Sequence, residues 1–172
     1  MKKFNEAINA FRSSLSGNKI DSLKDFSFFD LEYFAGCYLG LGHNYLANKI
    51  LHSAISYDEG RAAKLRNSRI FNSLGIIQLR LRESEKASTF FNKALALEKE
   101  LFGENKIGFN IYHNLGMAEE NSSLAISYFE KSIKIQTQKF PETHPSLSPT
   151  YSGLIYEYNN LGDYNRSRAY AE

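Results

Sequence analysis

The sequence predicts an all-α protein built from antiparallel helix hairpins, and three features of its 172 residues support this. Small residues recur at helical spacing where two helices would touch, as at Gly75, Ala87 and Ala94. Similar pairs of segments return about every 40 residues along the chain. All three prolines fall between residues 141 and 149, so the rest of the chain is free to be helical.

The stretch 71–94 shows the hairpin pattern most clearly. Phe71, Leu74 and Gly75 share one face of a first helix. Ala87 and Phe91 share one face of a second helix, beyond a polar Arg-Glu-Ser-Glu corner. Small residues let the two backbones approach, and large residues fill the space that remains. The stretch therefore predicts two closely packed antiparallel helices.

The same pattern divides the chain into consecutive units. Residues 1–17 supply only a second helix, because Ala7 corresponds to Ala47 in the next unit. We expect full repeats at about residues 28–67, 68–108 and 109–147, and an incomplete repeat at 148–172. Together these units, residues 1–172, are expected to form a single repeat domain.

The third and fourth units depart from the pattern. Gly116 and Ala125 are closer in sequence by three residues than Gly75 and Ala87. We expect this deletion, close to one helical turn, to shorten the corner near residues 120–122 and to open or tilt the stack there. The last unit stops about halfway through its second helix without a polar capping helix, so we expect a fragment or an end that a partner covers.

These residues resemble a known repeat family. The spacing Phe71-x-x-Leu74-Gly75, followed by Ala87-x-x-x-Phe91-x-x-Ala94, resembles the tetratricopeptide repeat (TPR). The period near 40 residues, with Thr143-His144-Pro145 before a first helix, resembles the kinesin-light-chain-type variant. The resemblance covers nearly the whole chain. It implies an α-solenoid, wound as a right-handed superhelix, in which first helices line a concave groove.

The resemblance also implies which side chains face the groove. Asn114 stands where related proteins use asparagine to hydrogen-bond a peptide backbone, since an amide offers both a donor and an acceptor. The alternative is that Asn72, Asn110 and Asn114 bond water or neighbouring helices. The implied peptide-binding residues are Tyr33, Arg66, Arg69, Asn72, Ser73, Arg80, Asn110, His113, Asn114, Tyr156 and Asn159.

Three arginines suggest one kind of partner. Arg66, Arg69 and Arg80 recur at helical spacing, which places three guanidinium groups along one helix face. If that face lines the groove, it favours an acidic segment, because guanidinium pairs with carboxylate in bidentate geometry. The alternative is a solvated helix face with Glu83 and Glu85 nearby.

Composition removes several other classes of function. With 21 basic and 19 acidic residues the net charge is +2, which gives no reason to expect a nucleic-acid partner. No apolar run approaches the roughly 20 residues that cross a bilayer. The single Cys37 fits a reducing, cytoplasmic location. The four histidines lack metal-ligand spacing, so we expect no metal, no cofactor and no enzymatic activity.

Three functional hypotheses follow from the repeats. The first is a protein-interaction module or scaffold that binds a peptide or a partner helix in its concave groove. The second is a sensory or regulatory segment of a larger protein, in which groove occupancy controls an attached effector domain. The third is a structural role, in which uncapped ends self-associate head to tail.

Overall fold

The computed structural model describes residues 27–56, 59–103 and 108–171, and within these ranges the chain is helical without strands. The elements are α2 (Phe28–Gly40), α3 (Asn44–Ser53), α4 (Arg61–Arg80), α5 (Ser84–Phe102), α6 (Phe109–Ala118), α7 (Ser122–Thr137), the 3-10 turn η3 (Pro145–Leu147), α8 (Ser148–Asn160) and α9 (Tyr164–Ala169). The all-α prediction is confirmed. The second helix expected within residues 1–17 lies outside the described residues.

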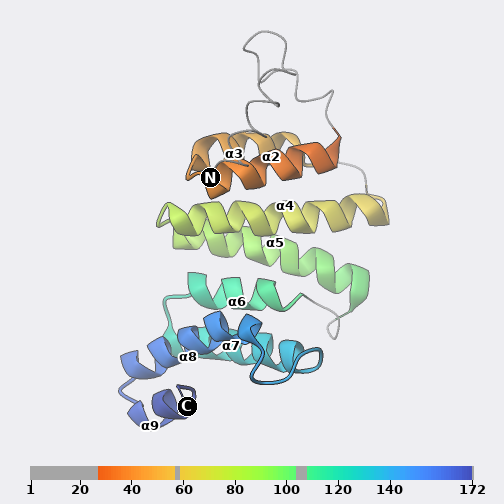
Figure 1. The fold of residues 1–172 in the computed structure, drawn as a ribbon. Coiled ribbons are helices and arrows are strands. Elements are labelled where there is room, and N and C mark those ends of the chain that lie inside the picture. Colours follow the sequence, from red (N-terminus) through yellow and green to blue (C-terminus); the bar gives the residue numbers. More distant parts are fainter. Residues whose placement is uncertain (1–26, 57–58, 104–107, 172) are drawn as a thin grey trace.

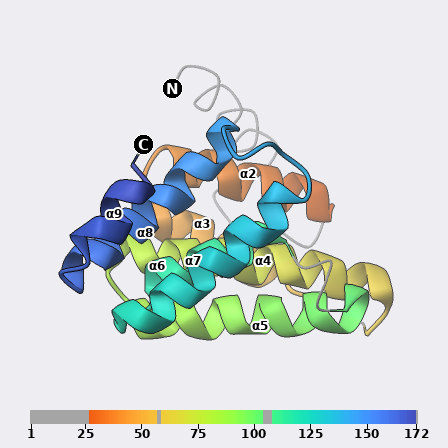
Figure 2. The same ribbon diagram turned by 90° about the horizontal axis from the view of Figure 1, so that it is seen from below.

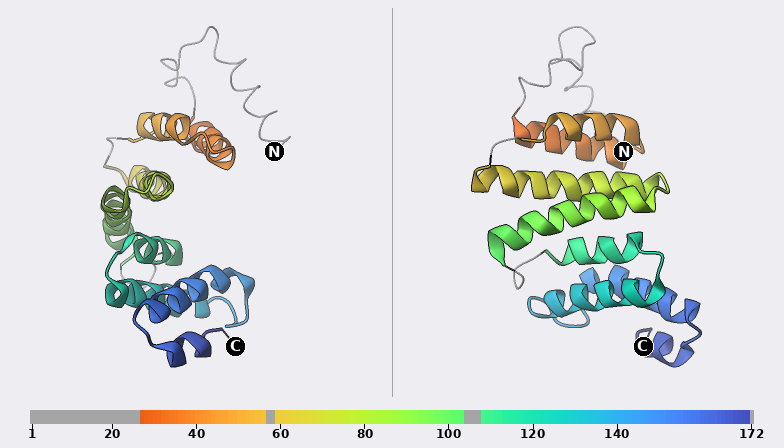
Figure 3. Two further views of the ribbon diagram at one scale, coloured as in Figure 1. Left: turned by 90° about the vertical axis from the view of Figure 1, so that its left-hand side faces the viewer. Right: turned by 180° about the vertical axis from the view of Figure 1, so that it is seen from behind.

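Consecutive helices pair as hairpins, and the pairs stack in chain order (Figure 1). Seen end-on in the left view of Figure 3, the stack forms an arc with the first helices α2, α4, α6 and α8 on its inner side. Each first helix also contacts the next first helix. Seen along the stack, the helices of successive pairs are rotated relative to one another (Figure 2). The predicted α-solenoid is therefore confirmed.

Three of the hairpin corners are built in the same way. Gly42, Arg82 and Gly162 have left-handed backbones, with φ angles of 80°, 64° and 74°. The next residue donates its N–H to a carbonyl five positions earlier, as Glu83 does to Gln78 at 2.9 Å. This arrangement satisfies helix-terminal carbonyls and reverses the chain within three residues.

The corner between α6 and α7 differs, and the prediction that the deletion shortens it is wrong. The connection keeps three residues, 119–121, so the deletion lies in α6, which ends two residues after Gly116. Glu119 has an extended backbone, and its Oε1 accepts from the N–H groups of Glu120 and Asn121 at 3.1 Å. Asn121 then caps α7 by accepting from Leu124 at 3.0 Å. These side-chain bonds replace the left-handed corner after a helix shortened by one turn.

The first turns of α4 also differ from the expected repeat, which begins at about residue 68. The helix begins at Arg61, because Ala, Arg, Lys and Leu at its start are good helix formers. Ala63 is fully buried, and the Arg61 guanidinium lies over the Phe102 ring at 5.3 Å. Part of the long repeat period is thus used to lengthen α4 rather than its connection.

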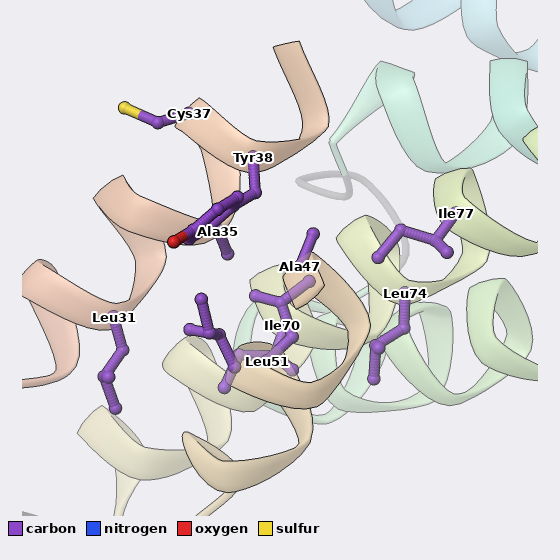
Figure 4. Packing of buried hydrophobic residues seen from close by; sticks show 10 residues of the cluster. Leu31, Ala35, Cys37, Tyr38, Ala47, Leu51, Ile70, Leu74 and Ile77 are labelled. Atoms are coloured by element: carbon purple, nitrogen blue, oxygen red, sulfur yellow. The ribbon is translucent and has the colours of Figure 1, made fainter. Parts of the chain in front are cut away.

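The core follows the contrast of small and large residues that the sequence predicted. In the first cluster, apolar side chains of α2 and α3, among them Leu31 and Leu51, pack with Ile70 and Leu74 of α4 (Figure 4). A Cβ at Gly75 would lie 2.4 Å from Cε1 of the buried Phe91, so only glycine fits without movement. The packed arc holds the inner faces of the first helices in fixed relative positions.

The Thr-His-Pro sequence lies at the start of α8, the first helix of the last hairpin, as predicted. Pro145 opens η3, and the Nδ1 atom of His144 accepts from the N–H of Ser146 at 3.2 Å. A histidine thus acts as the N-cap, and proline occupies the first turn where its missing N–H costs nothing. The turn leads directly into α8 and sets its entry to the stack.

Candidate functional site

The predicted site residues all lie on the first helices, which form the inner side of the arc (Figure 3). Tyr33 is on α2; Arg66, Arg69, Asn72, Ser73 and Arg80 are on α4; Asn110, His113 and Asn114 are on α6; Tyr156 and Asn159 are on α8. Tyr33 and Tyr156 expose 59% and 64% of their surface. They belong to the two end helices of the set, so any one ligand touching both would run across the whole inner side.

The three arginines of α4 that were predicted to line the groove already have contacts within the chain. Arg69 forms an ion pair with Glu32 of α2, with 2.8 Å between Nη2 and Oε1. Arg80 donates from Nη1 to the carbonyl of Leu39 at 2.6 Å. The guanidinium of Arg66 lies over the Phe28 ring at 5.6 Å. These contacts tie α2 to α4, and Glu32 offsets part of the positive charge that the sequence suggested.

Two asparagines bridge the next pair of first helices. The Nδ2 group of Asn114 donates to Oδ1 of Asn72 at 2.9 Å. Within the described residues, Nδ2 of Asn72 and Oδ1 of Asn114 have no protein partner. The pair therefore combines the two readings of the sequence: it joins neighbouring helices and still offers one donor and one acceptor. Ser73 is half-buried and Asn110 is exposed, and both flank this pair along their helices.

A pocket of about 400 Å³ lies between α6 and α8. Its lining residues are His113, Gly116, Met117, Phe129, Pro149, Ser152, Gly153, Tyr156 and Glu157. Phe129 comes from α7 and is almost wholly buried, whereas Met117 exposes 53% of its surface. A Cβ at Gly116 would lie 2.7 Å from the Phe129 ring, and one at Gly153 would lie 2.6 Å from it. The two glycines thus let one aromatic ring fill the space between two first helices.

His113 connects the pocket to a buried polar cluster. Its Nδ1 lies 3.2 Å from Oγ1 of Thr150, and Gln136 donates to that same hydroxyl at 3.2 Å. Gln136 also donates to Ser132, whose hydroxyl donates to the carbonyl of Phe109 at 2.9 Å. Burial lowers the pKa of His113 below its usual value of 6.5. The imidazole is therefore neutral at pH 7.

Glu157 gives the pocket a negative charge. Its side chain belongs to a residue only 9% exposed, and its Oε2 accepts from Nδ2 of Asn160 at 3.2 Å. In the described part of the chain, no lysine or arginine forms an ion pair with it. An acidic side chain in a largely buried residue, without an ion pair to a described cation, makes the pocket a place for a complementary group.

Sequence reasoning placed His113 and Tyr156 among the groove residues, but it singled out neither Phe129 nor Glu157 as part of a binding site. Phe129 is a core residue, and its ring also forms one wall of the pocket. Glu157 was missed because it lies between an exposed and a buried tyrosine. The available signal was that α8 contains no other charged residue.

The structure shows neither a metal cluster nor a membrane span in the parts that it describes. Among those residues, no three His, Cys, Asp or Glu side chains gather closely enough to hold a metal ion. No described helix combines the length and the apolar character needed to cross a membrane.

Comparison with known proteins supports the repeat assignment. Residues 68–101 match the family model described as "Tetratricopeptide repeat". No curated protein matches the chain. The resemblance to tetratricopeptide repeats is thus confirmed at the central hairpin formed by α4 and α5.

Solved structures share the fold over almost the whole chain. BtubC (BKLC) from P. vanneervenii is 22% identical, with a TM-score of 0.76 over 98% of this chain and 70% of that one. The apo form of RapI is 19% identical, with a TM-score of 0.79 over 98% and 62%. A putative kinesin light chain with nearly identical TPR-like repeats from P. anserina is 15% identical, with a TM-score of 0.62 over 98% and 80%. At these identities the similarity concerns the fold.

Proposed function

We propose that this TPR-like solenoid is a protein-interaction module or scaffold, and that an extended peptide or a partner helix binds in a groove along its inner side. The observation that carries the proposal is the exposure of Tyr33, Met117 and Tyr156 on first helices that bury other side chains in the core. Large exposed side chains on a rigid surface supply contact area at low entropic cost, and aromatic residues are typical anchors of interfaces.

The Asn72 and Asn114 pair supports recognition of a main chain. A peptide unit carries one N–H donor and one C=O acceptor. The pair offers the matching acceptor on Asn114 and the matching donor on Asn72. Such bonds would hold a segment in register irrespective of its side chains, while the exposed aromatic residues would select among sequences.

An acidic segment over α4 is part of the proposal, and the ion pair between Glu32 and Arg69 allows a direct test. If Arg69 contacts the partner, Glu32→Gln should tighten binding of an acidic peptide because it releases the guanidinium. Arg69→Gln should weaken it. If neither variant changes the affinity, the acidic preference is wrong.

The binding role itself is tested with a peptide library displayed against the whole chain. The best peptide is then titrated into wild type and into a Tyr33→Ala, Tyr156→Ala double variant. The matched control is Tyr45→Ala, Tyr164→Ala, which removes two tyrosines of second helices that are even more exposed than the inner pair. We expect at least a tenfold loss of affinity for the inner variant only. Equal losses in both variants, or none in the inner one, would refute binding along the inner side.

Two alternative functions, control of an attached domain and self-association, would use the inner side and the ends of the stack, respectively. Control of an attached domain by groove occupancy would require the same binding step, so the library experiment precedes it. Self-association through the ends would appear as a mass that rises with concentration in sedimentation. A cytoplasmic location is supported by the free thiol of Cys37, which is buried.

A further inference from the structure

We infer that the pocket between α6 and α8 receives one lysine or arginine side chain of the bound segment. The inference rests on the proposed function and adds the chemistry of one contact to it. A side chain of this kind combines an apolar stem with a cationic end, and the pocket offers a counterpart to each part.

The cationic end is matched by Glu157. Among the lining residues, Glu157 is the one with a carboxyl group, and burial lowers the pKa of His113, the one histidine beside it. The only hydrogen bond that the described residues give its carboxylate comes from the uncharged amide of Asn160. A buried carboxylate is stabilised most by a cation that also donates hydrogen bonds. A guanidinium or ammonium group supplies both, and no described residue of this chain does so.

The apolar stem is matched by the remaining lining. Phe129 forms the inner wall, where its ring packs against the backbones of Gly116 and Gly153. Met117 and Tyr156 stand at the exposed rim, where an aromatic face can also attract a cation. A volume of about 400 Å³ is at the small end of ligand pockets, so one side chain fits better than a larger molecule.

The charges along the inner side favour the same occupant. The α4 helix carries five basic residues and no acidic one, while α8 carries Glu157 and no basic one. A segment with acidic residues near α4 and one basic residue at the pocket would match both ends. Such opposite charges would also fix the direction in which the segment lies.

The test uses small probes for the side chain rather than a partner. The chain has two methionines, so methyl-labelled methionine gives a simple NMR spectrum, and Met117→Leu identifies the signal from the pocket. The probes are n-butylguanidinium and its neutral isostere n-butylurea. We expect both to shift the Met117 methyl signal, with a dissociation constant about fivefold lower for the cation.

Two variants separate charge from shape. Glu157→Gln should make the two probes bind equally, whereas Glu85→Gln, which changes the same charge at an exposed site on α5, should keep the difference. Equal binding of both probes to wild type would overturn the cationic preference and leave an apolar anchor pocket, so the proposed function would stand. If neither probe shifts the Met117 methyl signal, the pocket assignment itself is wrong. The proposed binding along the inner side is then still tested by the peptide-library experiment.

Discussion

Gly75 allows the packing of the central hairpin to be tested with a single methyl group. In Gly75→Ala, the new Cβ would lie 2.4, 2.6 and 2.8 Å from three atoms of the Phe91 ring. That ring is fully buried, so it has no solvent-exposed space into which it can move. Gly36 is the matched control, because it also lies within a helix and a Cβ there would meet nothing within 4 Å.

The two substitutions add the same atoms to a helix, so their difference isolates the packing. Alanine in place of glycine favours a helix by about 1 kcal/mol, and Gly36→Ala should gain roughly that stability. At Gly75 the same gain is opposed by an overpacking cost of about 1 to 3 kcal/mol. We therefore expect Gly75→Ala to be about 1 to 3 kcal/mol less stable than Gly36→Ala.

Urea unfolding followed by circular dichroism at the helix band measures this difference. Phe91→Leu removes ring atoms that the new methyl would meet, so it should make Gly75→Ala less costly than in the wild-type background, with a coupling of about 1 kcal/mol. Equal stability of Gly75→Ala and Gly36→Ala, or no coupling to Phe91, would refute the close packing of α4 on α5.

Three further changes test other parts of the structure. Arg82→Gly should raise the free energy of unfolding by about 1 kcal/mol, because Arg82 holds a left-handed backbone that its counterpart Gly162 adopts without strain; Gly162→Arg should lower it. Glu98→Ala should lower the thermal midpoint, since its carboxylate accepts from the N–H of Gly108 and from the hydroxyl of Ser68, at a cost of about 1 to 2 kcal/mol. Burial lowers the pKa of His113, so below pH 6.5 the unfolded chain binds more protons than the folded chain. The urea midpoint should therefore decrease as the pH is lowered below 6.5, and this decrease should be smaller in His113→Gln.

The fold could be predicted from the sequence because its units repeat. Gly75 with Phe91 shows a close approach of two helices, and the same contrast at Gly116 and Phe129 repeats it one unit later. Residues that fill a repeated core must keep a repeated spacing, so the hairpins are visible without any structure. The sequence could not show which residues absorb a deletion, and the shortening of α6 instead of its corner depended on the local bonds of Glu119.

The sequence predicted the residues of the inner side only in part. Register placed Tyr33, Asn114 and Tyr156 on first helices, and that requires no more than helical periodicity. The pairing of Arg69 with Glu32 depends on how two helices cross, which spacing within one helix does not specify. The Glu157 pocket depends on three helices at once, so periodicity alone gave no sign of it.

The central claim is that the inner side of the arc holds the partner, and hydrogen exchange with the peptide selected by display tests it most directly. The backbone amides of the helices are compared with and without that peptide. We predict that added protection is concentrated on α2, α4, α6 and α8. It should extend to α7 only near Phe129, which lines the pocket between α6 and α8. Protection concentrated on α3 and α5 would contradict the claim, because these helices lie on the outer side of the arc (Figure 3).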